Sequence, residues 1–142
     1  MSSKDLEEGA AGVNRESARA WFRALGASDF PAMRALLCED VEFWTSPSVR
    51  KGAIAGREEV MGRLERVFSS GRYYAPGSFA CEILDVIAER DQSAAHVVMR
   101  GRFPNGNRYE NVYLVWQRWR DGLMAYQLEI FDAAYWANQH GA

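Results

Sequence analysis

Cysteine and histidine are scarce in this sequence, with two of each among 142 residues. The cysteines, Cys38 and Cys81, have neither the CxxC spacing nor the nearby histidine that a metal site needs, and the two histidines are far apart. We therefore expect no metal site and no cofactor. We also expect both thiols to be free, in a reducing cytoplasm.

Excess positive charge and long apolar runs are also missing. The formal net charge is −2 and no basic patch is present, so the sequence offers no electrostatic basis for binding nucleic acid. No apolar run approaches the length of a membrane span, and the polar, acidic start is unlike a signal peptide. We expect a cytoplasmic protein with neither a nucleic-acid nor a membrane partner.

The most informative stretch is residues 109–132, which reads as two long strands joined at Asp121-Gly122. Asp-Gly between two runs rich in Val, Tyr, Trp, Ile and Phe is a strong hairpin signal. Alternating side chains put an amide, a phenol and a carboxylate on one face together with apolar residues. The members of that face are Asn111, Tyr113, Val115, Gln117, Gln127, Glu129 and Phe131. Such a mixed lining is typical of a ligand pocket.

The rest of the chain completes an α+β pattern. Helical spacing predicts three helices, beginning near Asn14, Asp29 and Gly56, with a short strand at 41–45 after the second. Long strands follow at 79–89 and 94–103, and residues 133–142 can pack Tyr135 and Trp136 back on the sheet. We expect a flexible tail over residues 1–13 and one domain over 14–142, with helices on one side of a mostly antiparallel sheet.

The second face of the sheet also needs a cover, because three short helices cannot cover both faces. Without one, it would expose an apolar patch. The patch is expected to contain Val97, Met99, Val112, Leu114, Trp116, Leu128 and Ile130. We predict a homodimer through this outer face.

This layout resembles the nuclear transport factor two-like superfamily, and within it the SnoaL-like branch of polyketide cyclases and relatives of ketosteroid isomerase and limonene epoxide hydrolase. The best marks are WFRALGASDFPAMRALLCEDVEFW (21–44), GREEV (56–60) and LEIFD (128–132), and the resemblance spans residues 14–136. It implies a cone-shaped α+β barrel, with three N-terminal helices packed on a curved, mostly antiparallel sheet that encloses a pocket. The fold hosts many reactions as well as non-enzymes.

The residues that the resemblance aligns depart from both known reactions. Where the isomerases keep a tyrosine and two acids, this chain has Phe22, Ser46 and Val115. Where the epoxide hydrolases keep an arginine and two aspartates, it has His96, Val98 and Glu129. The resemblance therefore leaves a histidine and a carboxylate at positions where relatives keep acid–base groups.

Glu129 and His96 are the candidate catalytic pair. Glu129 lies among Leu128, Ile130 and Phe131, and apolar surroundings raise the pKa of a carboxyl so that it can exchange a proton near pH 7. A histidine exchanges protons in the same range. The alternatives are a Glu129 paired with Arg100 or another arginine, and a core His96 bonded to a backbone carbonyl.

Asn111 and Tyr113 are candidates for holding a carbonyl or enolate oxygen, or are ordinary polar lining. The other predicted substrate-binding residues are Phe22, Trp44, Ser46, Val98, Arg100, Val115, Gln127 and Phe131; core packing alone would explain the apolar ones. We predict a small cyclase, isomerase or dehydratase that moves a proton beside a carbonyl of an apolar, polyketide- or terpenoid-like substrate. The alternative is a non-catalytic ligand-binding or dimerisation module on the same fold.

Overall fold

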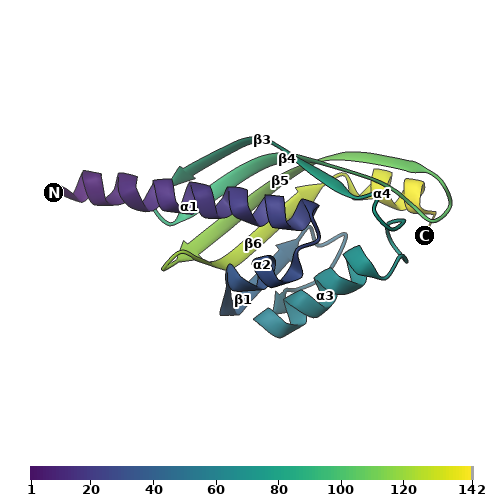
Figure 1. Ribbon diagram of the computed structural model, residues 1–142, viewed down its shortest axis with the longest axis horizontal. Helices are drawn as coiled ribbons and strands as arrows, with labels where there is room; N and C mark the ends of the chain where they lie inside the picture. The colour runs from purple at the N-terminus through teal and green to yellow at the C-terminus, as the bar shows by residue number, and fades with distance from the viewer. Residues whose placement is uncertain (142) are drawn as a thin grey trace.

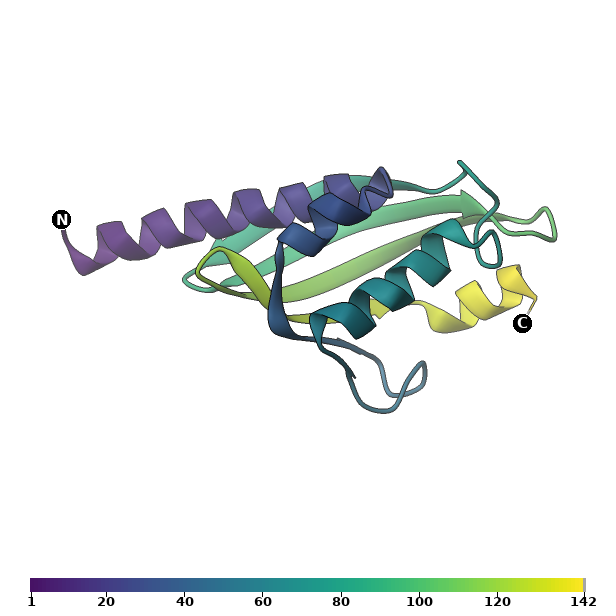
Figure 2. The same cartoon turned by 60° about the horizontal axis from the view of Figure 1, so that its bottom comes forward.

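Six strands form one curled sheet, and the helices gather on its inner face (Figure 1, Figure 2). The computed structural model describes residues 1–141. In chain order its elements are α1 (Ser3–Gly26), α2 (Phe30–Ala35), β1 (Leu37–Thr45), β2 (Ile54–Ala55), α3 (Arg57–Ser69), β3 (Ala80–Glu89), β4 (Gln92–Arg102), β5 (Arg108–Arg120), β6 (Leu123–Phe131) and α4 (Ala133–His140). The strand order is β2-β1-β6-β5-β4-β3, and only β1 and β6 are parallel. The predicted α+β barrel with a curved, mostly antiparallel sheet is confirmed.

The β5–β6 hairpin at the centre of the sheet has the turn that the sequence predicts. Asp121 and Gly122 both have positive φ, at 53° and 78°. Two consecutive residues in this region match the right-handed twist of the strands they join, and Asp-Gly adopts the conformation easily. On β5 the odd-numbered residues from Tyr109 to Trp119 are buried and the even-numbered ones are exposed, so one face is covered and the other is open.

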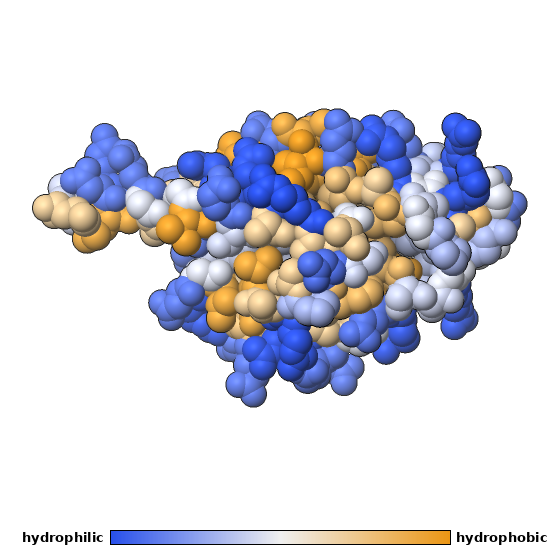
Figure 3. All heavy atoms as spheres, viewed as in Figure 1, coloured by the Kyte–Doolittle hydropathy of each residue, from blue (hydrophilic) through white to orange (hydrophobic). Residues whose placement is uncertain are grey.

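α1 is longer than predicted. It begins at Ser3, where the Ser2 hydroxyl accepts from the Asp5 amide and the Asp5 carboxylate accepts from the Ser2 amide. Asn14, the predicted start, lies inside the helix and donates from Nδ2 to the Arg90 carbonyl at 2.8 Å. Residues 3–13 are therefore helical, whereas the sequence predicted a flexible tail before a helix that begins near Asn14. Figure 3 shows these first turns projecting from the body of the molecule.

The second half of α1 carries the main apolar contacts between helix and sheet. Ala18, Trp21, Phe22 and Leu25 follow at helical spacing and are almost fully buried. α1 packs on β3 and β4, while α3 packs on β1. The Trp21 ring also meets Phe43 of β1 edge-on, with ring centroids 5.8 Å apart. The two helices thereby stand away from the middle of the sheet and leave room over β5 and β6.

β4 presents the opposite face to the one expected. Val97 lies beside Tyr113, and Met99 lies beside Asn111, so these two apolar residues face inward and are buried. His96 pairs with Leu114, and Val98 pairs with Val112. The side chains of Leu114 and Val112 are exposed on the outer face. The prediction that Val97 and Met99 belong to the outer patch was wrong, because alternation puts His96, Val98 and Arg100 there instead.

α4 packs the end of the chain back on the sheet, as predicted for Tyr135 and Trp136. The Asp132 carboxylate caps it by accepting from the Tyr135 amide at 3.0 Å. Both cysteines are free. Within residues 1–141, no helix is both long enough and apolar enough to cross a membrane.

Candidate functional site

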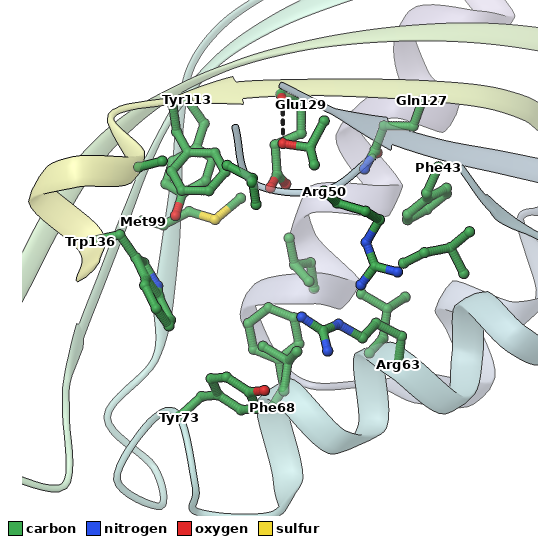
Figure 4. Close-up of a pocket in the computed structure, with 18 of the residues that line it drawn as sticks. Phe43, Arg50, Arg63, Phe68, Tyr73, Met99, Tyr113, Gln127, Glu129 and Trp136 are labelled. Atoms are coloured by element: carbon green, nitrogen blue, oxygen red, sulfur yellow. Dashed lines mark hydrogen bonds between the residues drawn. The ribbon is translucent and has the colours of Figure 1, made fainter. Parts of the chain in front are cut away.

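A cavity of about 610 Å³ lies between the inner face of the sheet and the helices α1, α3 and α4 (Figure 4). Its walls are mainly apolar and aromatic. They include Trp21, Phe22, Leu25, Phe43, Ile54, Leu64, Val67, Phe68, Tyr73, Tyr74, Met99, Phe131 and Trp136. Its polar groups are few, which is the usual composition of a small-molecule site. The volume is within the range of pockets that bind drug-sized small molecules.

Glu129 of β6 is the one acidic residue that lines the cavity in the part of the chain that the structure describes. Its side chain points from the sheet into the cavity (Figure 4). No side chain within residues 1–141 forms an ion pair or hydrogen bond with its carboxylate; the Thr45 hydroxyl donates to the Glu129 backbone carbonyl instead, at 3.1 Å. Burial raises the pKa of Glu129 from 4.5 to about 7, because removal from water disfavours the charged form. Glu129 can therefore take or give a proton near neutral pH.

Tyr113 of β5 is the neutral hydrogen-bond donor beside this acid. Its strand neighbour on β6 is Phe131, two residues from Glu129, and both point to the same side of the sheet. The Tyr113 hydroxyl is hydrogen-bonded to the Tyr109 hydroxyl, and Tyr109 accepts from Asn111 Nδ2 at 3.0 Å. Burial holds the pKa of Tyr113 far above its usual range, and raises that of Tyr109 to about 12. Both phenols therefore keep their protons across the physiological range.

Asn111, Tyr109 and Tyr113 form a hydrogen-bonded chain that ends in the cavity. Asn111 is fixed by a second bond, from Nδ2 to the Asp132 carbonyl at 3.0 Å, so its amide donates toward Tyr109. If Tyr109 then donates to Tyr113, the Tyr113 proton is free to bond an oxygen of a ligand. Successive hydrogen bonds polarise one another, which makes the last donor stronger. A base at Glu129 and a donor at Tyr113 are the two groups needed for enolisation of a carbonyl compound.

Six of the predicted site residues border the cavity, although the side chain of Trp44 is on the outer face beside Leu128. They are Phe22, Trp44, Tyr113, Gln127, Glu129 and Phe131. Gln127 is held from behind by Gln117, whose Nε2 donates to Gln127 Oε1 at 2.9 Å. Phe131 stacks on Tyr113 with ring centroids 4.7 Å apart. The prediction of a mixed polar and apolar face on β5 and β6 therefore agrees with the observed lining.

Three predicted residues lie close to the cavity but not on its surface. Asn111 and Val115 are on the inner face and are buried, so Asn111 acts through Tyr109 instead of touching a ligand. Ser46 directly follows β1 and is not part of the lining, whereas Ser48 two residues later is. These three residues therefore do not line the cavity, in contrast to the prediction.

His96, Val98 and Arg100 are on the outer face, so their assignment to the pocket was wrong too. His96 is exposed there and lies between Asp85 of β3 and Leu114 of β5. Arg100 forms ion pairs with Glu82 at 2.7 Å and Glu110 at 2.9 Å, also on that face. Arg100 is therefore not the partner of Glu129, and His96 is on the wrong face to act with it.

The wall formed by the loop after α3 and by α4 was not among the predicted site residues, although the sequence predicted that α4 packs on the sheet. The His140 ring stacks on Trp136 at 4.6 Å, and its Nε2 lies 3.3 Å from the Arg72 carbonyl. Tyr74 is buried against Gly101, where an added Cβ would come within 2.7 Å of the ring. The clustering of Tyr73, Tyr74 and Trp136 in otherwise polar segments is the signal that could have found this wall.

Comparison with known families and structures agrees with this architecture. The model of the SnoaL-like domain family matches residues 18–127. The curated proteins gave no match. An NTF2-like protein of unknown function from Burkholderia pseudomallei K96243 superposes with a TM-score of 0.79 at 19% identity, over 92% of this chain and 98% of the other.

Two further solved structures carry functional names. The candidate polyketide cyclase IdmH from Streptomyces antibioticus has a TM-score of 0.73 at 19% identity, over 91% of this chain and 99% of the other. A candidate ketosteroid isomerase from Kribbella flavida DSM 17836 has a TM-score of 0.69 at 21% identity, over 86% of this chain and 79% of the other. At these identities the similarity shows the shared fold.

Proposed function

Because this chain belongs to the SnoaL-like domain family, we propose that it is a cofactor-independent enzyme that moves a proton beside a carbonyl group of a mostly apolar small molecule. The observation that carries this proposal is the unpaired carboxyl of Glu129, whose pKa is raised to about 7 inside an apolar cavity. A polyketide- or terpenoid-like molecule has the size and the apolar surface that the cavity accepts.

The reaction begins with the carbonyl oxygen at Tyr113 and the adjacent C–H at Glu129. The Glu129 carboxylate takes the proton from carbon, and the C–H electron pair forms the C=C bond of an enolate. The Tyr113 hydroxyl donates to the enolate oxygen, on which the negative charge develops. The Tyr109–Asn111 chain behind Tyr113 keeps that hydroxyl in place.

The enolate then has three fates that need no cofactor. Return of the proton from Glu129 to a different carbon gives isomerisation. Attack of the enolate carbon on a second carbonyl gives cyclisation, and loss of a hydroxyl from the neighbouring carbon gives dehydration. In each route the protonated Glu129 gives up its proton and the carboxylate is restored: the proton goes to carbon in isomerisation, to the new alkoxide in cyclisation, and to the departing hydroxide, which leaves as water, in dehydration.

The test follows exchange of α-protons of an apolar ketone, such as 2-decalone or 2-tetralone, with solvent deuterium by NMR. We expect the wild-type protein to exceed the buffer rate and Glu129→Gln to fall to that rate with its fold intact. Glu110→Gln, a change of the same kind on the outer face, is the control. Equal exchange by Glu129→Gln would refute the assignment, and ketone binding without exchange would favour the ligand-binding module.

We also propose that two copies pair through the outer face. An apolar stripe crosses five strands on this face. Its members, each paired with the next, are Ile87, Ala94, Trp116, Leu128 and Trp44. The neighbouring Leu114 is 59% exposed and Ile130 is 43% exposed. A contiguous apolar face of this kind is rare on a monomer.

A further inference from the structure

The cavity contains more positive charge than the proposed chemistry uses. Three arginines line it, Arg50, Arg63 and Arg72, against the single carboxylate of Glu129 in the described part of the chain. Arg50 comes from the loop between β1 and β2, and Arg63 comes from α3. Their side chains are only partly exposed, and Figure 4 shows both guanidinium groups pointing into the cavity.

Arg50 and Arg63 have no carboxylate partner among the described residues, and unlike the equally unpaired Arg66 they line the cavity. Arg34 pairs with Glu58, and Arg120 pairs with Asp40. Within residues 1–141, neither Arg50 nor Arg63 forms an ion pair, although Glu59 stands one helical turn before Arg63 on α3. The Arg63 guanidinium instead makes a cation–π contact with the Tyr73 ring, whose centroid lies 5.8 Å from the guanidinium carbon.

Two guanidinium groups that share a mainly apolar cavity repel each other and have lost part of their hydration. An anion between them offsets both the repulsion and the lost hydration, and it accepts several charge-assisted hydrogen bonds. Glu129 does not serve as that anion, because among the described residues its carboxylate forms no ion pair with either arginine. A ligand carboxylate can therefore bind the arginines while Glu129 stays free for proton transfer.

We propose that Arg50 and Arg63 form a carboxylate subsite, and that the substrate is an apolar keto acid. Its carboxylate binds the two guanidinium groups, and its ketone and adjacent C–H lie at Tyr113 and Glu129. The subsite fixes the direction in which the molecule enters, so that the ketone end is presented to the acid–base pair. This inference rests on the proposed function for the identity of the ketone end, but the carboxylate subsite can be measured by binding alone.

The experiment compares acids with their neutral amides on the same apolar body. 2-Naphthylacetate with 2-naphthylacetamide, and 4-biphenylacetate with 4-biphenylacetamide, are titrated into the full chain by calorimetry at pH 8. We expect each acid to bind at least tenfold more tightly than its amide, because hydrogen bonds from guanidinium groups to a carboxylate are charge-assisted at both partners and those to an amide are not. The preference should shrink as salt is added.

Variants assign that preference to the two arginines. Arg50→Gln and Arg63→Gln should each weaken acid binding about 10- to 100-fold and leave amide binding unchanged. Arg66→Gln is the matched control. Arg66 lies on α3 three residues after Arg63, is exposed, and does not line the cavity. Its acid affinity should equal that of the wild type.

Three results would overturn the proposal. These are equal affinity for acid and amide, absence of binding by both compounds of both pairs, and an equal loss of amide binding in the arginine variants. Ketone exchange that depends on Glu129 would still support the proposed function in any of these cases. Conversely, an acid preference that depends on the arginines, without any ketone exchange, would leave the subsite standing and remove the catalytic role.

Discussion

The Glu129→Gln substitution should stabilise the protein at alkaline pH and change little at acidic pH. The folded state holds Glu129 with a pKa of about 7, against 4.5 for the free side chain. Between these values the folded chain binds the extra proton, so the wild type loses stability as pH rises through this interval. Glutamine imitates the protonated form and does not pay this cost.

The gain in free energy of unfolding from Glu129→Gln follows from the difference between the folded and unfolded pKa values of Glu129. Each pH unit corresponds to about 1.4 kcal/mol, so the full interval corresponds to about 3 kcal/mol. The cavity is open to solvent on one side, so we expect about 2–3 kcal/mol to be measured. The difference in free energy of unfolding should be near zero at pH 4.5, grow to pH 7, and stay constant above it.

Urea unfolding of both proteins at half-unit steps from pH 4.5 to 8.5 measures this difference. Glu89→Gln, an exposed carboxylate on β3, is the control, and its difference from the wild type should stay flat over the range. A Glu129→Gln difference that is independent of pH would refute the burial argument. A wild type that gains stability relative to the variant as pH rises would reverse its sign.

Three further substitutions test other parts of the account. Tyr113→Phe removes the donor at the enolate oxygen and should slow ketone exchange about 10²- to 10³-fold with little change in ketone affinity, as NMR exchange and titration would show; unchanged exchange would exclude that role. Gly101→Ala places a methyl group 2.7 Å from the Tyr74 ring, and should lower the free energy of unfolding by about 1–3 kcal/mol in urea; wild-type stability would mean that the ring moves freely. Trp116→Glu puts a charge in the centre of the apolar stripe and should convert a dimer to a monomer in sedimentation equilibrium; a wild-type protein that is already monomeric would contradict the pairing.

The central hairpin and the position of Glu129 could be predicted from the sequence. Asp121-Gly122 fixes the turn, and alternation fixes which side chains share a face within each strand. The apolar neighbours of Glu129 on its own strand already indicated a raised pKa. A register shift between Arg118 and Trp119 is what brings the Glu129 face of β6 onto the Tyr113 face of β5, and the turn alone does not predict that shift.

The face of β4 could not be fixed in the same way. The β4–β5 connection has Arg102 opposite Arg108, with residues 103–107 between them. Moving that pairing by one residue turns every side chain of β4 to the other side of the sheet. The resemblance to relatives placed His96 inside, whereas the observed register puts it outside and brings Met99 into the cavity.

The remaining omissions involve contacts between distant segments. His140 lies at the end of the chain and gains its place only by stacking on Trp136 of α4, next to Tyr73. Arg50 and Arg63 meet the cavity from a loop and a helix that no local pattern relates. The early start of α1 was different, because Ser2 and Asp5 are a capping box that can be read directly from the sequence.

The measurement that tests the central claim most directly is an NMR titration of the Glu129 side-chain carboxyl carbon between pH 4 and 9, with Glu129→Gln used to assign the signal. The account predicts a midpoint near pH 7, set by the apolar cavity. A midpoint near 4.5 would contradict it, because a solvated or paired carboxylate would then occupy the site and could not hold a proton for transfer at neutral pH.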